Sequence, residues 1–289
     1  MQTPFQYSGS KFNIRNFIIS HFPKHKLYAE AFGGSAAILL SKFPSEIEAY
    51  NDINSQLVNF FRTLQDPERA EKLEHRIQNT LYSYSEFCLA LETLANPDST
   101  PDDRAWSWYV SQNQGFAGCA KGKGSWGREL RSSKSSISWN NRKEKFPIWR
   151  DRLKHVQIDN RDALQFIQYW DSVDTLHYLD PPYPLGTRKS KVMYQHEQDD
   201  CFHRKLVETI LELKGMVILS SYPNPIYDRL LAAGWQKKEK AVLASRIGQT
   251  RSFQSKGSKV AEIGKRTEVI YLSPNVVHPH EQLVMEESE

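Results

Sequence analysis

Residues 176–183 read Leu-His-Tyr-Leu-Asp-Pro-Pro-Tyr and combine an apolar run with an abrupt, rigid turn. The run at 176–180 predicts a strand that ends before Pro181-Pro182, because proline donates no ladder hydrogen bond. In open α/β sheets, ligands bind beyond the carboxyl ends of the strands. The turn is therefore expected to hold the Asp180 carboxylate, the Pro181 carbonyl and the Tyr183 ring in one small pocket.

These three groups suit an exocyclic amino group of a nucleobase, whose lone pair is delocalised into the ring. Two acceptors, Asp180 and the Pro181 carbonyl, would hold its N–H groups and stabilise the positive charge that develops during attack. Tyr183 would stack on the extruded base. The candidate catalytic residues are thus Asp180, Pro181, Pro182 and Tyr183. A plain proline turn after a strand is the alternative.

Strands and helices alternate outward from this stretch. Further strands are predicted at 26–30, 46–52, 156–160, 215–221 and 267–273, and helices at 36–43, 54–64 and 162–170. The apolar run at 215–221 is typical of a strand covered on both faces. This alternation predicts an α/β fold with a doubly wound, parallel sheet and helices on both faces.

A glycine-rich turn, Glu-Ala-Phe-Gly-Gly-Ser-Ala (30–36), follows the first strand. Glycines let a ligand approach the backbone closely, and a strand-end carboxylate can bind an ammonium or a hydroxyl. Asp52 ends the next strand, at a spacing that suits ribose hydroxyls. Asp162 has the same place after a third strand, with a helix N-cap as its alternative role. The candidate cofactor residues here are Glu30, Phe32, Gly33, Gly34, Ser35, Asp52 and Asp162.

The region from about 60 to 153 interrupts the alternation. It is predicted to be helical at 68–93 and rich in loops afterwards, and it contains five of the seven tryptophans. A stretch of this length between strands is better explained as a subdomain than as a connecting loop. We expect a main domain at 1–60 and 154–275, an inserted, mainly helical and loop-rich subdomain at 61–153, and an acidic flexible tail at 276–289.

Positive charge is concentrated in two segments although the net charge is only +4. Residues 119–152 hold ten Lys or Arg against three acidic residues, and residues 236–266 hold nine against two. Such a distribution favours a partner lined with phosphates, and two solvated surface loops are the alternative. Candidate contacts with such a partner are Lys121, Lys123, Arg128, Arg131, Lys134 and Arg251.

Other features exclude whole classes of protein. The three cysteines form no CxxC pair and the nine histidines show no HExxH spacing, so we expect neither a metal site nor a disulfide framework. No apolar run approaches the roughly 20 residues of a membrane helix, and no secretory signal is visible. We expect a reducing, cytoplasmic setting and no membrane partner.

An aromatic–glycine–lysine segment at 7–11 completes a recognisable order: this segment, the glycine turn, the long insertion and the Asp-Pro-Pro-Tyr turn. In this order the chain resembles the Dam-type (D12 class) family of DNA adenine-N6 methyltransferases, which use S-adenosyl-L-methionine (AdoMet). The resemblance implies a Rossmann-like class I methyltransferase sheet and a target-recognition role for the insertion. It also implies that Tyr7, Lys11, Asp52 and Asp180 hold the cofactor, and that Thr187, Arg188 and Tyr194 close over the flipped base. The chain departs from the family pattern at Ser10, Ala31 and Ala36.

The expected activity is methyl transfer from AdoMet to N6 of a flipped adenine in double-stranded DNA, by a monomer or weak dimer in a bacterial or phage-infected cell. The same chemistry on cytosine N4, on an RNA base or on a glutamine amide is an alternative. A catalytically silent DNA-binding protein is another. An NAD enzyme is disfavoured because the glycine turn does not match GxGxxG.

Overall fold

The computed structural model describes residues 2–7, 9–116, 122–129, 132–183, 199–243 and 265–276. Several predictions lie outside these residues: the DNA contacts at Lys121, Arg131, Arg188, Tyr194 and Arg251, the role of Thr187, and the tail from residue 277 onward.

A seven-stranded sheet forms the centre of the fold, in the order β3-β2-β1-β4-β5-β7-β6. The strands are β1 (Leu27–Glu30), β2 (Ile47–Asn51), β3 (Val156–Asp159), β4 (Thr175–Leu179), β5 (Met216–Ser221), β6 (Gln236–Leu243) and β7 (Lys265–Leu272). Neighbours from β3 to β5 pair in parallel, whereas β7 runs antiparallel to both β5 and β6. The α/β class is therefore confirmed, and the expectation of an all-parallel sheet is corrected at this edge.

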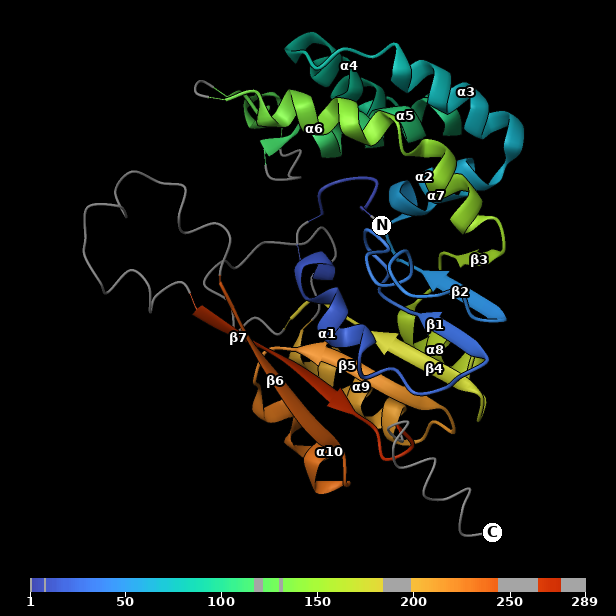
Figure 1. The fold of residues 1–289 in the computed structure, drawn as a ribbon, viewed down its shortest axis with the longest axis vertical. Coiled ribbons are helices and arrows are strands. Elements are labelled where there is room, and N and C mark those ends of the chain that lie inside the picture. Colours follow the sequence, from blue (N-terminus) through green and yellow to red (C-terminus); the bar gives the residue numbers. More distant parts are fainter. Residues whose placement is uncertain are drawn as a thin grey trace, which may run out of the picture.

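Helices cover both faces of the sheet, as predicted (Figure 1). One face packs its Tyr28, Tyr50 and Tyr178 against α1 (Arg15–Ile19) and α2 (Ser55–Gln65). The other face packs Ala29 and Leu219 against helices that follow strands. These helices are α8 (Ala163–Tyr169), α9 (Asp200–Leu211) and α10 (Asp228–Ala232). Alternate residues of one strand thus enter two separate cores.

The helix predicted at 36–43 is absent, and this segment forms a series of turns. Two features of the backbone explain the difference. Ala36 has a φ of 54°, in the left-handed region that a helix cannot continue. The Leu39 N–H donates to the Glu30 carboxylate at 3.0 Å instead of to a carbonyl one turn earlier. Ala36 is also where the resembling family has glycine, the residue that adopts this φ without strain.

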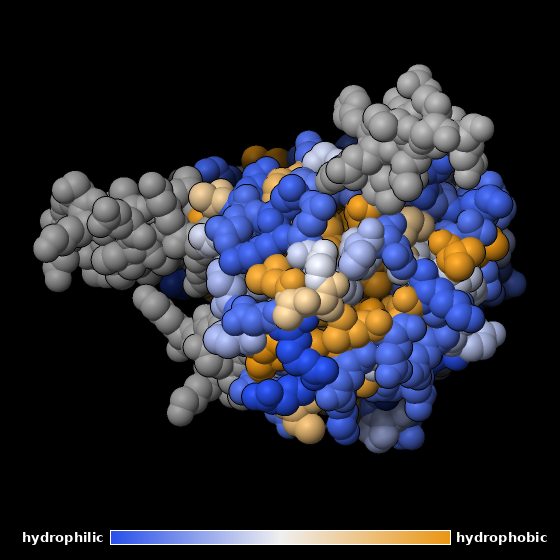
Figure 2. Space-filling model, turned by 90° about the horizontal axis from the view of Figure 1, so that it is seen from below, coloured by the Kyte–Doolittle hydropathy of each residue, from blue (hydrophilic) through white to orange (hydrophobic). Residues whose placement is uncertain are grey.

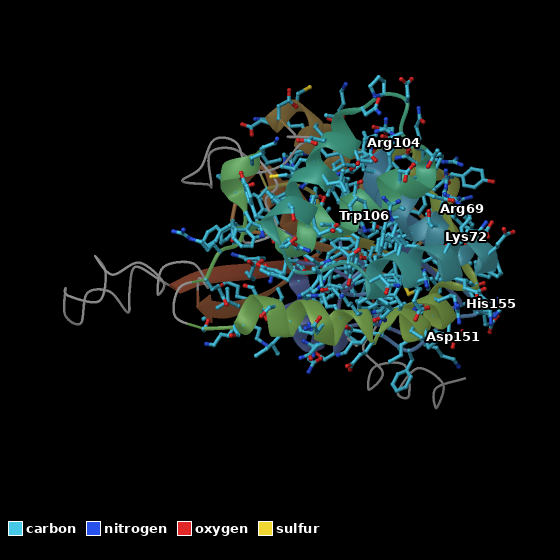
Figure 3. All side chains as sticks on the ribbon, turned by 90° about the horizontal axis from the view of Figure 1, so that it is seen from above. Arg69, Lys72, Arg104, Trp106, Asp151 and His155 are labelled. Carbon is cyan, nitrogen blue, oxygen red and sulfur yellow. The ribbon has the colours of Figure 1, made fainter. Side chains whose placement is uncertain are left out.

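The insertion forms a layer of helices above the sheet (Figure 1). It comprises α3 (Pro67–Gln78), α4 (Tyr84–Ala95), α5 (Pro101–Gln114), the short η3 (Lys123–Ser125), α6 (Lys134–Lys143) and α7 (Phe146–Leu153). The insertion is more helical than expected after residue 93, because its tryptophans form a core. Trp106 lies in the middle of the layer, whereas Lys72 and Asp151 lie at its edge (Figure 3). The Trp106 Nε1 donates to Thr80 Oγ1 at 2.9 Å.

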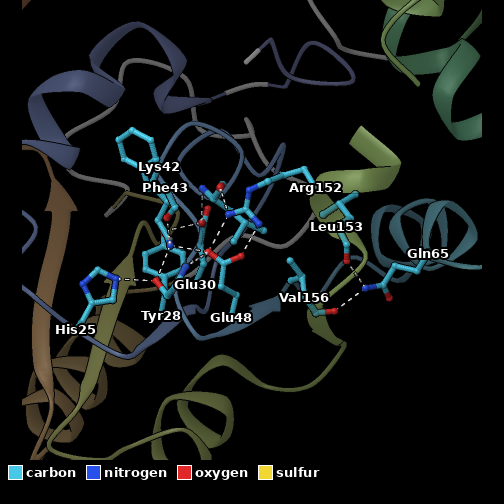
Figure 4. Close-up of polar contacts among 12 residues, drawn as sticks. His25, Tyr28, Glu30, Lys42, Phe43, Glu48, Gln65, Arg152, Leu153 and Val156 are labelled. Atoms are coloured by element: carbon cyan, nitrogen blue, oxygen red, sulfur yellow. Dashed lines mark hydrogen bonds and ion pairs between the residues drawn. The ribbon is translucent and has the colours of Figure 1, made fainter. Parts of the chain in front are cut away.

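A buried ion-pair cluster joins the end of this layer to the sheet (Figure 4). Glu48 of β2 accepts hydrogen bonds from Arg152 of α7 and from Lys42, the latter at 2.6 Å. Although burial raises the pKa of Glu48, the hydrogen bonds from these two cations hold it below its usual range. Arg152 also donates to the Leu39 carbonyl at 2.7 Å. Arg152, which lies shortly before β3, therefore links the end of the insertion to the turn that follows β1.

The face of the molecule seen from below is mostly hydrophilic around a smaller hydrophobic area (Figure 2). Within the described part of the chain, every helix is too short or too polar to cross a bilayer.

Candidate active site

The candidate site lies where the strand order reverses, between β1 and β4. In doubly wound sheets this switch point is where ligands bind. Glu30 ends β1 and is paired in register with Tyr178 of β4, two residues before Asp180. A cavity of about 910 Å³, counted with its open mouth, lies at this edge.

All ten residues that the sequence proposed for the cofactor line this one cavity. They are Tyr7, Lys11, Glu30, Phe32, Gly33, Gly34, Ser35, Asp52, Asp162 and Asp180. Of the other catalytic candidates, Pro182 also lines it, whereas Pro181 and Tyr183 do not appear among its described lining residues. The lining also includes residues that were not among the candidates from the sequence, such as Ile38, Ile53 and Asn54. Ile53 and Asn54 could have been found, since they directly follow Asp52 at a strand end.

Asp180 is held by the N-terminal segment. The Lys11 ammonium lies 2.9 Å from Asp180 Oδ1, and it also donates to the Gly9 carbonyl at 3.2 Å. Burial raises the pKa of Asp180 to about 6, although the charge of Lys11 opposes this rise. The negative charge of Glu268 on β7 adds to the rise. Asp180 is thus an acceptor that ionises near neutral pH.

Tyr183 lies beside the cavity, with its ring in contact with three other side chains. The Lys11 ammonium stands over one face, 4.6 Å from the ring centre. The Tyr222 ring lies at an interplanar angle of 65° to it, with the ring centroids 4.3 Å apart. The hydroxyl donates to Glu268 Oε2 at 2.8 Å. Lys11 therefore touches both the acid and the aromatic ring of the Asp-Pro-Pro-Tyr turn.

The glycine turn approaches two tyrosines so closely that side chains are excluded. A Cβ on Gly33 would lie 2.0 Å from Cε2 of Tyr50, whose hydroxyl donates to the Gly34 carbonyl at 2.6 Å. A Cβ on Gly34 would lie 3.0 Å from Tyr7. Ser35 Oγ shares a hydrogen bond of 2.9 Å with Ser10 Oγ. The turn and the N-terminal segment thus form one wall of the cavity.

A family comparison agrees with this architecture. The family model of D12 class N6 adenine-specific DNA methyltransferases matches residues 7–240. The match begins at Tyr7 and includes the glycine turn, the insertion and the Asp-Pro-Pro-Tyr turn.

The chain belongs to the D12 class family.

This membership identifies the protein as an enzyme that methylates adenine N6 in DNA. It supports neither methylation of cytosine or of RNA nor a catalytically silent DNA-binding protein. No curated protein matches the chain.

In this methyltransferase, the two aspartates that follow β2 and β3, Asp52 and Asp162, have structural partners as well. Asp52 accepts the Gly34 N–H at 2.9 Å and the Asn54 N–H at 2.8 Å. Asp162 caps α8, since its Oδ1 accepts the N–H groups of Leu164 and Gln165. The N-cap alternative for Asp162 is therefore correct, and the same residue also lines the cavity. A carboxylate has about four acceptor positions, so both roles are compatible.

Glu30 is the most deeply buried carboxyl group of the methyltransferase cavity. Its Oε2 accepts the Tyr28 hydroxyl at 2.7 Å and the Leu39 N–H at 3.0 Å. Burial raises the pKa of Glu30 to about 8, and the two hydrogen bonds oppose this rise. Glu30 is therefore mostly neutral at pH 7.

The basic insertion of this methyltransferase is only partly available for DNA. Lys134 and Arg128 are exposed, and Lys123 is exposed but paired with Glu92 at 2.6 Å. Lys143 is instead buried and donates to the Thr80 carbonyl at 2.6 Å and to the Gln78 carbonyl at 3.1 Å. Arg142 is buried and donates to Ser138 Oγ, and Arg152 donates to the Leu39 carbonyl at 2.7 Å. Part of the positive charge counted in the sequence therefore supports the fold. No group of three or more metal-ligating side chains occurs in the described ranges.

Proposed function

We propose that this methyltransferase uses AdoMet, and that the corner formed by Asp180 and Pro181 presents N6 of an extruded adenine to it. The observation that carries the proposal is that all ten residues proposed for the cofactor line one cavity, with Asp180 at its edge and Tyr183 beside it. The strand-end positions of Glu30, Asp52 and Asp180 also support it.

The residues of the cavity fit this cofactor. Asp52 would accept hydrogen bonds from ribose hydroxyls, and Asp162 with Ile53 would face the adenine ring of the cofactor. Glu30 would accept hydrogen bonds from an ammonium, and Lys11 would attract a carboxylate. Gly33 and Gly34 also line the cavity, and the lack of a side chain lets their backbone pack closely against Tyr50 and Tyr7. AdoMet, when bound, supplies a methyl group that is already activated by its positively charged sulfur.

The chain's own task is then mainly to position the amino nitrogen. Asp180 and the Pro181 carbonyl would each accept one N–H of adenine N6, and Tyr183 would stack on the base. Because the proton can leave N6 after methyl transfer, Asp180 need not be a strong base, which agrees with its pKa of about 6.

Double-stranded DNA would be bound by the insertion at 61–153 next to the catalytic domain at 1–60 and 154–275. Lys134 and Arg128 are exposed on the insertion and would contact phosphates. Such binding weakens steeply with salt.

Equilibrium binding tests the cofactor proposal without any DNA. AdoMet is titrated into the purified protein by calorimetry, with Asp52→Ala as the site variant and Asp66→Ala, at the start of α3, as the control. We expect one site per chain, weakened at least tenfold by Asp52→Ala and unchanged by the control. Equal AdoMet affinity in wild type and Asp52→Ala would contradict the assignment of the cavity.

A further inference from the structure

Glu268 brings the last strand into contact with the catalytic turn. It lies on β7, beyond the residues 7–240 that the family model matches, and its Oε2 accepts the Tyr183 hydroxyl at 2.8 Å. Tyr183 is only 4% exposed. A buried hydroxyl without a partner would cost free energy, so this acceptor helps to determine where the ring lies.

Three side chains from different elements contact Tyr183. The Lys11 ammonium of η1 (Lys11–Ile14) stands over the ring, and the ring of Tyr222, which follows β5, meets it at an interplanar angle of 65°. The hydroxyl is the atom farthest from the backbone, so its hydrogen bond to Glu268 fixes where the end of the ring lies. The hydroxyl oxygen lies on the axis through Cβ and Cγ, so rotation about that axis is restrained by Lys11 and Tyr222 instead.

Glu268 is itself on a well-supported strand. Its neighbour Val269 pairs with Ser221 of β5 on one side and with Glu239 of β6 on the other. Lys240 stands opposite Glu268 on β6, with its ammonium 5.1 Å from the centre of the Phe17 ring. Because this part of β7 is paired on both sides, it holds the Glu268 carboxylate at a fixed place relative to the Asp-Pro-Pro-Tyr turn.

We propose that Glu268 is a positioning residue, which orients Tyr183 as the stacking surface for the target adenine by accepting its hydroxyl. The proposal rests on the function proposed above for Tyr183. It assigns a catalytic contribution to the β7–β6 edge, where the sequence predicted only a final strand and a basic segment.

A double-mutant cycle separates this role from a general effect on the fold. The variants are Glu268→Ala, Glu268→Gln, Tyr183→Phe and the double variant Tyr183→Phe/Glu268→Ala. Glu239→Ala is the matched control, because Glu239 lies on the neighbouring strand and pairs with Lys237 at 2.6 Å. Each protein methylates plasmid DNA that lacks N6-methyladenine, with radiolabelled AdoMet. S-adenosylhomocysteine affinity and the melting temperature are measured in parallel.

Loss of the hydrogen bond is expected to lower kcat roughly tenfold in Glu268→Ala. Glu268→Gln should recover most of that loss, because an amide oxygen also accepts the hydroxyl. In the Tyr183→Phe background, Glu268→Ala should have no further effect. The KM for AdoMet, the S-adenosylhomocysteine affinity and the activity of Glu239→Ala should remain unchanged.

Two results would overturn the proposal. One is a Glu268→Ala enzyme with wild-type kcat, and the other is an equal loss from Glu268→Ala with and without the Tyr183 hydroxyl. A wild-type protein that leaves the DNA unmethylated would instead contradict the proposed function as a whole. The two failures are therefore distinguishable.

Discussion

The Lys11 ammonium and the Asp180 carboxylate lie 2.9 Å apart, and this ion pair joins the N-terminal segment to the Asp-Pro-Pro-Tyr turn. The Lys11 side chain is 6% exposed and that of Asp180 is 16% exposed, so solvent screens the pair only weakly. The same ammonium lies over the Tyr183 ring. Lys11, Asp180 and Tyr183, which are proposed to contact the cofactor or the target base, therefore interact directly through the Lys11 ammonium.

The first prediction concerns the pH dependence of methylation. Burial raises the pKa of Asp180 to about 6, and the nearby charged groups are Lys11, Glu30 and Glu268. Since the ionised form is the better acceptor, the single-turnover rate should rise with pH around an apparent pKa of about 6. Lys11→Met removes a charge that lowers this pKa, so the midpoint should move to higher pH. An unchanged midpoint in Lys11→Met would contradict the assignment of this pH dependence to Asp180.

The second prediction concerns the free energy of unfolding. The pKa of Glu30 rises from 4.5 to about 8 on folding because of burial, so the folded protein binds more protons between these values. Stability should therefore fall as pH rises from 5 to 8, by up to about 1.4 kcal/mol per unit. Glu30→Gln cannot ionise, so its melting temperature should fall less over this range. Glu46→Gln, at an exposed site, serves as the control and should follow the wild type.

The third prediction compares two glycines. Gly33→Ala would force the new methyl group against Tyr50 at 2.0 Å, whereas a Cβ on Gly124 meets nothing within 4 Å. Gly33→Ala should lower the free energy of unfolding by roughly 1–3 kcal/mol and weaken AdoMet binding. Gly124→Ala should change neither. Chemical denaturation measures the free energy of unfolding and calorimetry measures AdoMet affinity. Equal values of both quantities in the two variants would contradict the close packing of Gly33 against Tyr50.

The fourth prediction distinguishes two lysines at opposite ends of α6. Lys134 is exposed, whereas Lys143 is buried against the carbonyls of Gln78 and Thr80. Lys134→Ala should weaken DNA binding, lower the salt slope by about one and leave the melting temperature unchanged. Lys143→Ala should mainly lower the melting temperature. Fluorescence anisotropy at several salt concentrations tests this, and a wild-type salt slope in Lys134→Ala would exclude a phosphate contact there.

The sequence could predict which residues come together at the cavity, because the strand-end residues of a doubly wound sheet converge at one edge. Glu30, Asp52 and Asp180 each follow an apolar run, and all three line the cavity. It could not predict the turn at 36–43, where an apolar pattern looks helical but the Leu39 N–H is taken by Glu30. Glu268 was missed for a related reason, because its contact with Tyr183 depends on the position of an antiparallel edge strand.

The basic segments illustrate the limit of counting charges. A pattern of Lys and Arg does not reveal which side chains find buried partners, as Lys143 does on Thr80 and Arg152 on Leu39. The strand β6 was also missed, because its lysine-rich sequence resembles an exposed loop more than a strand.

The most direct test of the account is nucleoside analysis by mass spectrometry of DNA incubated with AdoMet and either the wild type or Asp180→Ala. The wild type should produce N6-methyladenine, and Asp180→Ala should lower its rate at least roughly 100-fold while circular dichroism shows an intact fold. Asp180→Asn is less decisive, because its amide retains an acceptor oxygen. Methylation of adenine by Asp180→Ala at near wild-type rate would contradict the proposed grip on N6.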